Sequence, residues 1–302
     1  MSTTTTPTAA GPALGQQRRP HSASRAQLAS VAFLAILRRD VVVTGREFIP
    51  FLLQTLIQPL FFLFVFGKVL PGLSSAGGAG TAGVVSAGFA LLLLPGIVGL
   101  TVMIAALQGV TLPLVLDLGF AREIDDRLLA PLPVYLVAVE KILFAALRGL
   151  VAGAVIFPLA AWILGSGYAV RSDRIPELIA LMVLTAFAGA CLGLFIGTSI
   201  KPEQIGLMFS LIFTPLIFMG CTYYPWSGLA SIKWFQIATL FNPLTYASEG
   251  LRHAMVPPFH LAPGVSVSLP TLDMRWVLLA LLATIIIFYY LGVRTFRRRV
   301  VS

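Results

Sequence analysis

The sequence predicts an all-α integral membrane protein with six transmembrane helices, and three observations point to this class. Hydrophobic residues make up 58% of the chain and charged residues 11%, compared with about 25% charged residues in a soluble globular domain. Six apolar stretches approach or exceed the roughly 20 residues that a helix needs to cross a bilayer. Arginines cluster before the first stretch and after the last, and the positive-inside rule places such flanks in the cytoplasm.

The region before the first apolar stretch divides in two. Residues 1–23 are rich in Ser, Thr, Ala, Pro and Gly, a composition typical of a disordered cytoplasmic tail. Residues 24–46 mix arginines with apolar residues at an imperfect helical spacing, and we interpret them as an interfacial helix on the inner leaflet. The alternative is a soluble helix that packs on a partner.

The expected spans cover about 48–70, 84–112, 142–164, 175–200, 205–221 and 276–293. The arginine-rich flanks place both termini in the cytoplasm, and an even number of spans agrees with this; the 113–141 loop is then on the same side and the 222–275 segment outside. The fourth span carries Gly189, Gly193 and Gly197 on one ridge, which predicts close helix packing. The two cysteines are interpreted as buried, unpaired thiols.

The cytoplasmic loop contains a segment with the pattern of an amphipathic helix, at about 117–130. Phe120, Ile124 and Leu128 are spaced four residues apart, with charges on the other faces, and Pro131 ends the pattern. Such a helix can set an apolar ridge into the groove of a partner while its charges fix the register. A solvated helix without a partner is the alternative.

The outer segment at about 222–257 holds two apolar pieces of about a dozen residues each, which are too short to span a bilayer. Asn242 suits an N-cap and Pro243 a first helical turn. We therefore expect a re-entrant hairpin of two short helices, at about 229–240 and 244–255, before the last span. An ordinary extracellular loop with aromatic anchors is the alternative. Glu249 and Arg252 lie three residues apart and are expected to form a structural ion pair.

Two of these segments resemble parts of one family. Residues 241–252 read Phe-Asn-Pro-Leu-Thr-Tyr-Ala-Ser-Glu-Gly-Leu-Arg, which resembles the closing signature of type-2 ABC exporter permeases. The cytoplasmic helix resembles the coupling helix of the same family, which docks on an ATPase subunit. Many members begin that helix with Asp-Arg-Glu and a glycine, whereas this chain has Asp117-Leu118-Gly119 and a later Arg122-Glu123. The resemblance covers about residue 48 to the C-terminus.

The resemblance implies that residues 47–302 form an ABC-2 type transmembrane domain, similar to antibiotic-resistance and nodulation-factor permeases. Such a permease subunit sits in the bacterial plasma membrane and exports an amphiphile: a drug, polyketide, lipid or glycolipid. It works with a second permease, identical or paralogous, and with two separate nucleotide-binding ATPase subunits that bind ATP and Mg. The sequence has no Gly-x-x-x-x-Gly-Lys-Ser/Thr phosphate loop, so we expect no ATPase activity, no bound cofactor and no catalytic residue on this chain. Membrane lipids are expected partners and nucleic acid is not.

The predicted site residues fall into three groups. Two glutamines one turn apart avoid lipid, and soft or aromatic side chains suit an apolar substrate. The ATPase-coupling group is Asp117, Phe120, Arg122, Glu123, Ile124, Asp126, Arg127 and Leu128. The substrate-path group is Gln54, Gln58, Met208, Phe209 and Phe213. The exit-region group is Tyr223, Tyr224, Asn242, Pro243, Tyr246, Glu249 and Arg252. No metal site is expected.

Arg148 is a basic residue that falls inside the third expected span. It lies about 9 Å past the start of the third span, at 1.5 Å per residue, and a long arginine can snorkel much of that distance. We therefore favour a lipid-interface arginine slightly over a residue of the substrate pathway.

Three other functions remain alternatives. A polysaccharide exporter permease is similar in plan, but the spans carry phenylalanine rather than many tryptophans or tyrosines, which modestly favours lipids and drugs. An ion-coupled secondary transporter would need carboxylates at mid-membrane, and the expected spans have almost none. A purely structural scaffold would show no ATPase stimulation by any amphiphile.

Overall fold

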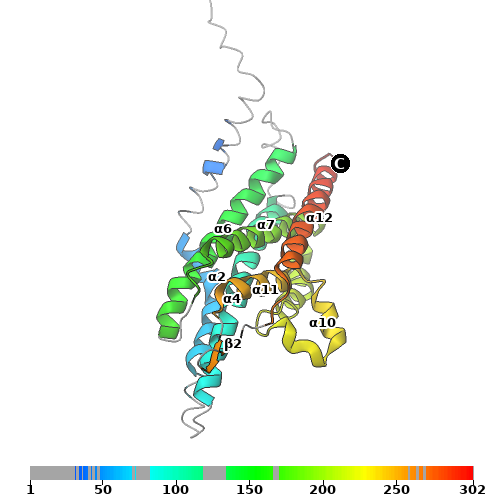
Figure 1. Cartoon of the computed structure of the whole chain (residues 1–302). Coiled ribbons are helices and arrows are strands. Elements are labelled where there is room, and N and C mark those ends of the chain that lie inside the picture. Colours follow the sequence, from blue (N-terminus) through cyan, green and yellow to red (C-terminus); the bar gives the residue numbers. More distant parts are fainter. Residues whose placement is uncertain are drawn as a thin grey trace, which may run out of the picture.

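The computed structural model is a bundle of long helices with a group of short helices packed against it (Figure 1). It describes residues 48–69, 82–117, 134–165, 170–257, 259–262, 265–267 and 270–301, together with position 72 and isolated positions between 31 and 45. The long helices are α2 (Phe48–Phe64, continued by the π-helix η1, Val65–Val69), α4 (Ala82–Leu116), α6 (Val134–Leu164), α7 (Ile175–Ser199) and α12 (Met274–Val301).

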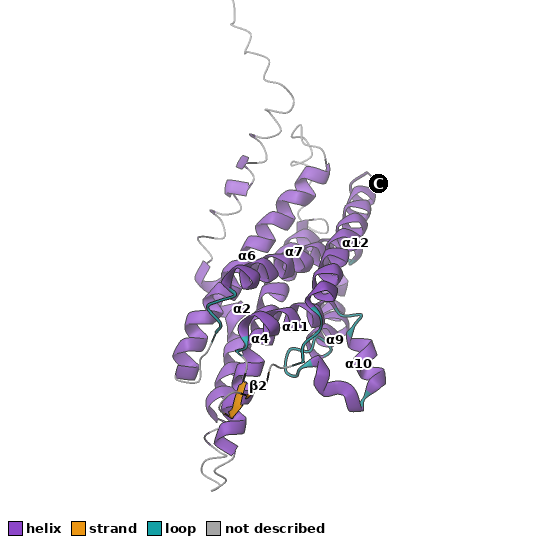
Figure 2. Ribbon diagram, viewed as in Figure 1, coloured by secondary structure: helices purple, strands orange, loops and turns teal. Residues whose placement is uncertain are grey.

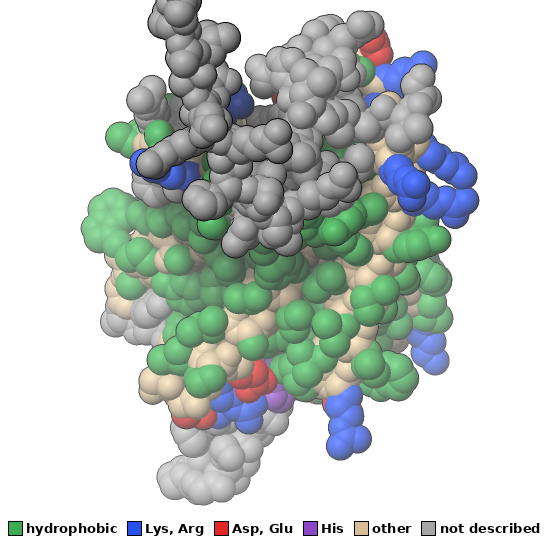
Figure 3. Space-filling view, turned by 90° about the horizontal axis from the view of Figure 1, so that it is seen from above, with side chains coloured by type: hydrophobic (Ala, Val, Ile, Leu, Met, Phe, Trp, Pro, Cys, Tyr) green, Lys and Arg blue, Asp and Glu red, His purple; other side chains and the backbone are tan. Residues whose placement is uncertain are grey.

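Five helices of the described chain are long and apolar enough to cross a membrane, and they match five of the six predicted spans. Helix α4 is the central one: 89% of its most apolar window is buried, against 22% for α2 and 17% for α12. A helix that is apolar on all sides can be surrounded by other helices, whereas α2 and α12 leave a face for lipid. Figure 3 shows the result, a broad band of hydrophobic side chains with charged side chains mostly toward its upper and lower edges.

Helix α6 begins at Val134, earlier than the predicted start at 142. The charges of Glu140 and Lys141 suggested a loop, but the helix continues through them and buries both side chains. Arg148 therefore lies about 21 Å along the helix, at 1.5 Å per residue, rather than near its start. This position overturns the reason for assigning the arginine to the lipid interface.

The predicted fifth span, 205–221, is not one continuous α-helix. It consists of η4 (Pro202–Gln204), α8 (Ile205–Met208), the π-helix η5 (Phe209–Phe213) and α9 (Thr214–Phe218). Pro215 has no N–H to donate and its ring crowds the preceding turn, which accounts for a π-helical turn just before it. The apolar helix from Pro202 to Phe218 is shorter than the five long spans.

The outer segment contains the two short helices that the sequence predicts. They are α10 (Lys233–Thr239) and α11 (Pro243–Met255), and a 3-10 helix, η6 (Trp226–Ser231), precedes them. An antiparallel ribbon of β1 (Phe259–Ala262) and β2 (Val265–Val267) follows, which the all-α prediction lacks; Figure 2 labels β2. The sequence between the strands is Pro263-Gly264, a typical hairpin signal.

Helices α4 and α7 pack closely through the predicted glycine ridge. A Cβ on Gly193 would lie 2.4 Å from the carbonyl oxygen of Leu107, and one on Gly189 would lie 2.5 Å from that of Met103. Thr111 donates from its Oγ1 to the carbonyl of Gly193 at 3.0 Å. The backbones meet because no side chain intervenes, so the predicted tight packing is confirmed.

The bundle has two ends, which we name for what they hold. The arginine end carries the last turns of α12, with Arg294, Arg297, Arg298 and Arg299, and the Arg299 guanidinium donates to the carbonyl of Ile200 just after α7. The α11 end is the opposite end, where α11 packs on the first half of α4. The described positions between 31 and 45 are helical and mostly exposed. The predicted tail at 1–23 lies outside the described residues.

Candidate functional site

A buried ion pair on α11 anchors the α11 end. Glu249 and Arg252 are fully buried, and the Arg252 guanidinium donates to the Glu249 carboxylate, which confirms the predicted pair. The guanidinium also donates to the carbonyl of Cys221 at 3.0 Å and to that of Leu92 at 3.4 Å. Two charges in a dry interior are tolerated because each is neutralised and hydrogen-bonded by the other.

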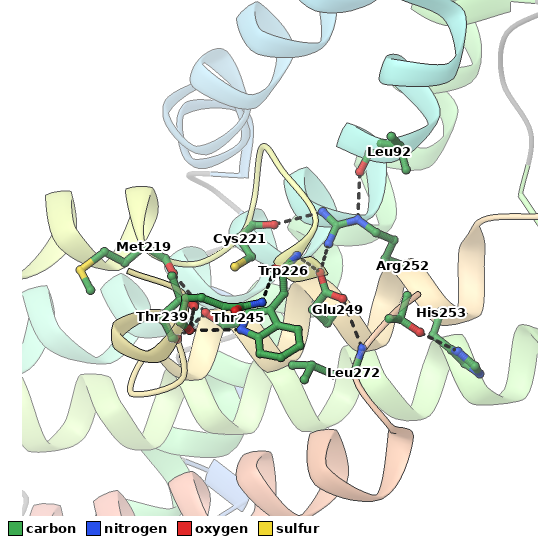
Figure 4. A network of polar contacts seen from close by, with 12 residues as sticks. Leu92, Met219, Cys221, Trp226, Thr239, Thr245, Glu249, Arg252, His253 and Leu272 are labelled. Carbon is green, nitrogen blue, oxygen red and sulfur yellow. Dashed lines mark hydrogen bonds and ion pairs between the residues drawn. The ribbon is translucent and has the colours of Figure 1, made fainter. Parts of the chain in front are cut away.

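The carboxylate of the pair extends the network to two more segments (Figure 4). Glu249 accepts from the backbone N–H of Trp226 at 2.9 Å and from that of Leu272 at 3.4 Å. The pair thus joins α4, the turn after α9, the start of η6 and the segment that leads into α12. Cys221 has a φ of 49°, a left-handed conformation that is costly for a residue other than glycine. The bond from Arg252 to its carbonyl helps to hold this turn.

Side chains of the Asn-Pro-Leu-Thr-Tyr signature form hydrogen bonds with backbone carbonyl groups near the C-terminal ends of neighbouring helices. The carboxamide of Asn242 accepts from the N–H of Leu244 at 3.0 Å as the predicted N-cap, and donates to the carbonyl of Leu216 in α9 at 2.7 Å. Thr245 donates to the carbonyl of Thr239 at 2.7 Å. The Tyr246 hydroxyl donates to the carbonyl of Leu240 at 2.9 Å. The last carbonyls of a helix lack partners within it, so these side chains complete the ends of α9 and α10.

The two predicted tyrosines lie at the same junction. The Tyr224 hydroxyl donates to the carbonyl of Phe218 at 2.5 Å, at the end of α9. The Tyr223 ring packs against Phe62 of α2, with 4.8 Å between the ring centroids. Burial raises the pKa of both phenols to about 12, so both stay neutral: Tyr224 acts as a hydrogen-bond donor and Tyr223 as a packing group. The structure thus places all seven exit-region residues in or around α11.

A cavity with both polar and apolar groups in its lining lies between α2, α4 and α6, toward the arginine end. Its volume is about 310 Å³, and Gln54 of the predicted substrate path lines it. Thr55, Gln108 and Arg148 also line it. The Arg148 guanidinium carbon lies 4.2 Å from the centroid of the Phe51 ring, a cation–π arrangement. The cavity combines a cation with neutral hydrogen-bond donors.

Sequence reasoning did not assign Thr55, Gln108 and Arg148 to the site. A glutamine inside an apolar span was a usable signal for Gln108, by the same reasoning that selected Gln54. Arg148 was considered and set aside because the start of α6 was placed too late. Gln58, one turn beyond Gln54, is exposed and does not line the cavity.

The other predicted residues are not gathered in this cavity. Met208 and Phe213 are buried in a cluster with Leu107, Leu192 and Ile196. Phe209 is in η5, but its side chain lies outside the described part. Asp117 directly follows α4, whereas the rest of the coupling group, in 118–133, falls outside the described residues. The roles proposed for these residues stay predictions. No group of three or more His, Cys, Asp or Glu among the described residues could hold a metal ion.

Four long apolar helices packed around a fifth, the buried α4, with a cavity between α2, α4 and α6, are typical of a multi-pass membrane protein. The family model described as "ABC-2 type transporter" matches residues 31–256, and the chain belongs to this family. Permease subunits of this family lack catalytic ATPase activity. The resemblance seen in the sequence is therefore confirmed.

Curated relatives agree with this assignment. The chain is similar to the inner membrane transport permease YadH of Escherichia coli strain K12, with 23% identity over 238 residues, which cover 75% of this chain and 83% of the relative. The YadH permease of Shigella flexneri matches with the same identity and coverage. The chain is thus an inner-membrane, multi-pass permease subunit of an ABC-2 type transporter.

Proposed function

We propose that this permease subunit exports an amphiphilic substrate, such as a drug, polyketide, lipid or glycolipid, across the plasma membrane. The energy comes from ATP and Mg bound on two copies of a separate nucleotide-binding subunit. The permease pairs with a second copy of itself or with a paralogue. The chain crosses the bilayer six times, with the helix from Pro202 to Phe218 as the shortest crossing, and both termini are cytoplasmic.

One observation supports the direction of transport: the cavity that holds Gln54 and Arg148 lies toward the arginine end, whereas α4 packs closely on α11 and on the turn at Thr222 at the other end. A Cβ on Gly96 of α4 would lie 2.0 Å from the carbonyl oxygen of Thr222, so the backbones are in direct contact there. A Cβ on Gly99 would lie 3.2 Å from Leu251 of α11. Because arginine-rich ends are cytoplasmic, the arrangement favours loading from inside and release past α11.

The conformational change driven by ATP is expected to reach the permease through the cytoplasmic helix at 117–130. Closure of the nucleotide-binding subunits pushes this helix, shifts the first and fifth spans across the permease dimer and opens a path outward. Charge reversal of Glu123→Arg together with Arg127→Glu should leave ATP hydrolysis but abolish export. Arg294→Glu is the matched control, because it reverses an exposed charge at the same end of the bundle. Normal export by the double variant would contradict this role.

The function is tested by reconstituting the permease with a nucleotide-binding subunit that co-purifies with it. The complex in proteoliposomes should hydrolyse ATP faster in the presence of a transported amphiphile, and the permease alone should not hydrolyse ATP. Vigorous hydrolysis by the permease alone would refute the proposal. Accumulation driven by an ion gradient without ATP would also refute it.

A further inference from the structure

The cavity between α2, α4 and α6 has the chemistry of an anion site. We propose that it binds the anionic head group of an amphiphile, phosphate or carboxylate, with Arg148 as the ionic partner. The inference deepens the proposed function, and it rests on that function where it identifies the bound amphiphile with the transported substrate.

The position of Arg148 is the first argument. The residue lies about 21 Å along α6, well inside a span, where a cation is costly unless it faces protein or a polar cavity. It lines the cavity, and its guanidinium carbon lies 4.2 Å from the centroid of the Phe51 ring. The cation–π contact orients the planar group. A guanidinium can donate two parallel hydrogen bonds to a phosphate or carboxylate, which a lysine cannot do.

The neutral groups of the cavity are the second argument. Gln54 and Thr55 come from α2 and Gln108 comes from α4, so with Arg148 of α6 three helices contribute polar groups to one space. Amides and a hydroxyl can donate to the oxygens of an anion that a guanidinium does not reach. Among the described residues that line the cavity there is no Asp or Glu. The described polar groups can therefore donate to an anion together with Arg148.

The size of the cavity and its mouth indicate that the ligand is an amphiphile. A volume of about 310 Å³ is at the lower end of the range of roughly 300–1,000 Å³ for small-molecule pockets, enough for a head group but not for its chains. Gln54, which lines the cavity, is exposed, so the cavity is accessible from the surface beside α2. Leu53 and Ile57 beside it are 66% and 60% exposed, so an alkyl chain has apolar surface to follow along α2.

The test measures binding of dodecyl phosphate to the full-length permease in phosphatidylcholine nanodiscs. Dodecyl phosphocholine has the same chain and a phosphate but no net charge, and it should bind more weakly. Arg148→Met should weaken dodecyl phosphate binding about tenfold or more, the effect of losing a charge-assisted hydrogen bond. Arg148→Lys should retain part of the affinity. Arg294→Met is the matched control, because it removes an exposed arginine from the same end, and it should bind as the wild type does.

Equal affinity of Arg148→Met and wild type for dodecyl phosphate would overturn the proposal, as would equally tight binding of the phosphocholine. If Arg148→Met does not fold, the double variant Gln54→Leu and Gln108→Leu keeps the arginine and should still weaken binding severalfold. Unchanged binding in that double variant would then overturn the proposal. Displacement of dodecyl phosphate by an equal concentration of inorganic phosphate would show that the alkyl chain adds nothing to the affinity. That result would overturn the assignment of the ligand as an amphiphile.

Experiments on the assembled transporter distinguish whether the head group belongs to a transported substrate or to a resident lipid. Stimulation of ATP hydrolysis by dodecyl phosphate, lost in Arg148→Met, would identify the site with the transported substrate. Binding that depends on Arg148 without any effect on hydrolysis, and competition by phosphatidylglycerol, would identify a resident anionic lipid in the same site. Failure of a nucleotide-binding subunit to assemble would refute the proposed function alone, because head-group binding is measured on the permease chain itself.

Discussion

The substitution Arg252→Met tests how far the ion pair on α11 holds the outer part of the molecule together. Methionine keeps most of the length of the side chain but removes its charge and its donors. The Glu249 carboxylate then stays fully buried, with the backbone N–H groups of Trp226 and Leu272 as its remaining donors in the described structure. The carbonyl of Cys221 loses its contact with the guanidinium, at a turn that already has an unfavourable φ of 49°.

Removing one partner of a buried ion pair costs about 3–5 kcal/mol, because the other charge is left buried without compensation. The same reasoning predicts the sign of the change in stability when Glu249 is also replaced. Adding Glu249→Gln to Arg252→Met removes that charge and keeps a side-chain carbonyl for the N–H of Trp226. The double variant should therefore be more stable than Arg252→Met alone, with a coupling free energy of about 1–3 kcal/mol between the two sites.

The assay is the apparent Tm of the purified permease, measured as the protein that stays monodisperse in gel filtration after heating. At roughly 2–4 °C per kcal/mol, Arg252→Met should lower the Tm by about 10 °C. Asp173→Asn is the control: its partner Arg171 lies at 2.6 Å, but Asp173 is exposed, and exposed pairs contribute little. A wild-type Tm for Arg252→Met, or a double variant less stable than the single one, would refute the reasoning.

Three further predictions concern the same end of the bundle. Gly96→Ala should lower the Tm by several degrees, because its Cβ would lie 2.0 Å from the carbonyl oxygen of Thr222. Gly206→Ala is the control: its Cβ would meet nothing within 4 Å, so the Tm should stay unchanged or rise slightly. Asn242→Ala should cost about 1–2 kcal/mol through the lost N-cap, read as a drop in Tm, and a Tm equal to wild type would contradict the cap. Burial raises the pKa of the Cys221 thiol to about 11, so N-ethylmaleimide should not modify its peptide at pH 8 in the folded protein but should do so after denaturation, as mass spectrometry can show.

Much of the architecture followed from the sequence because lipid restricts the options. Backbone polar groups must be satisfied within each span, so a long apolar run becomes a helix, and five of the six expected spans are confirmed. Local rules also gave correct details: Asn242 caps α11, Pro243 is in its first turn, and Glu249 pairs with Arg252. Each of these depends on neighbours within one helical turn.

The errors have a common physical origin in tertiary context. Glu140 and Lys141 suggested a loop because isolated charges disfavour an apolar span, but α6 buries both and continues through them. The helix up to Phe218 is interrupted near Pro215 by a π-helical turn, whose extent a hydropathy window does not register. The ribbon of β1 and β2 was missed because its two strands are very short.

By itself the sequence determined that the chain lies in a lipid bilayer, that it is helical, and which family signature it carries. Apolar composition and local capping rules depend on residues close together along the chain. Only the tertiary structure decided which polar side chains meet. Gln54, Gln108 and Arg148 come from α2, α4 and α6, and no spacing along the chain brings them to one cavity. Likewise, the partners of Arg252 include Leu92, 160 positions away. Contacts between helices depend on the rotation of each helix about its axis and on the positions of the neighbouring helices. Both are set only when the bundle packs.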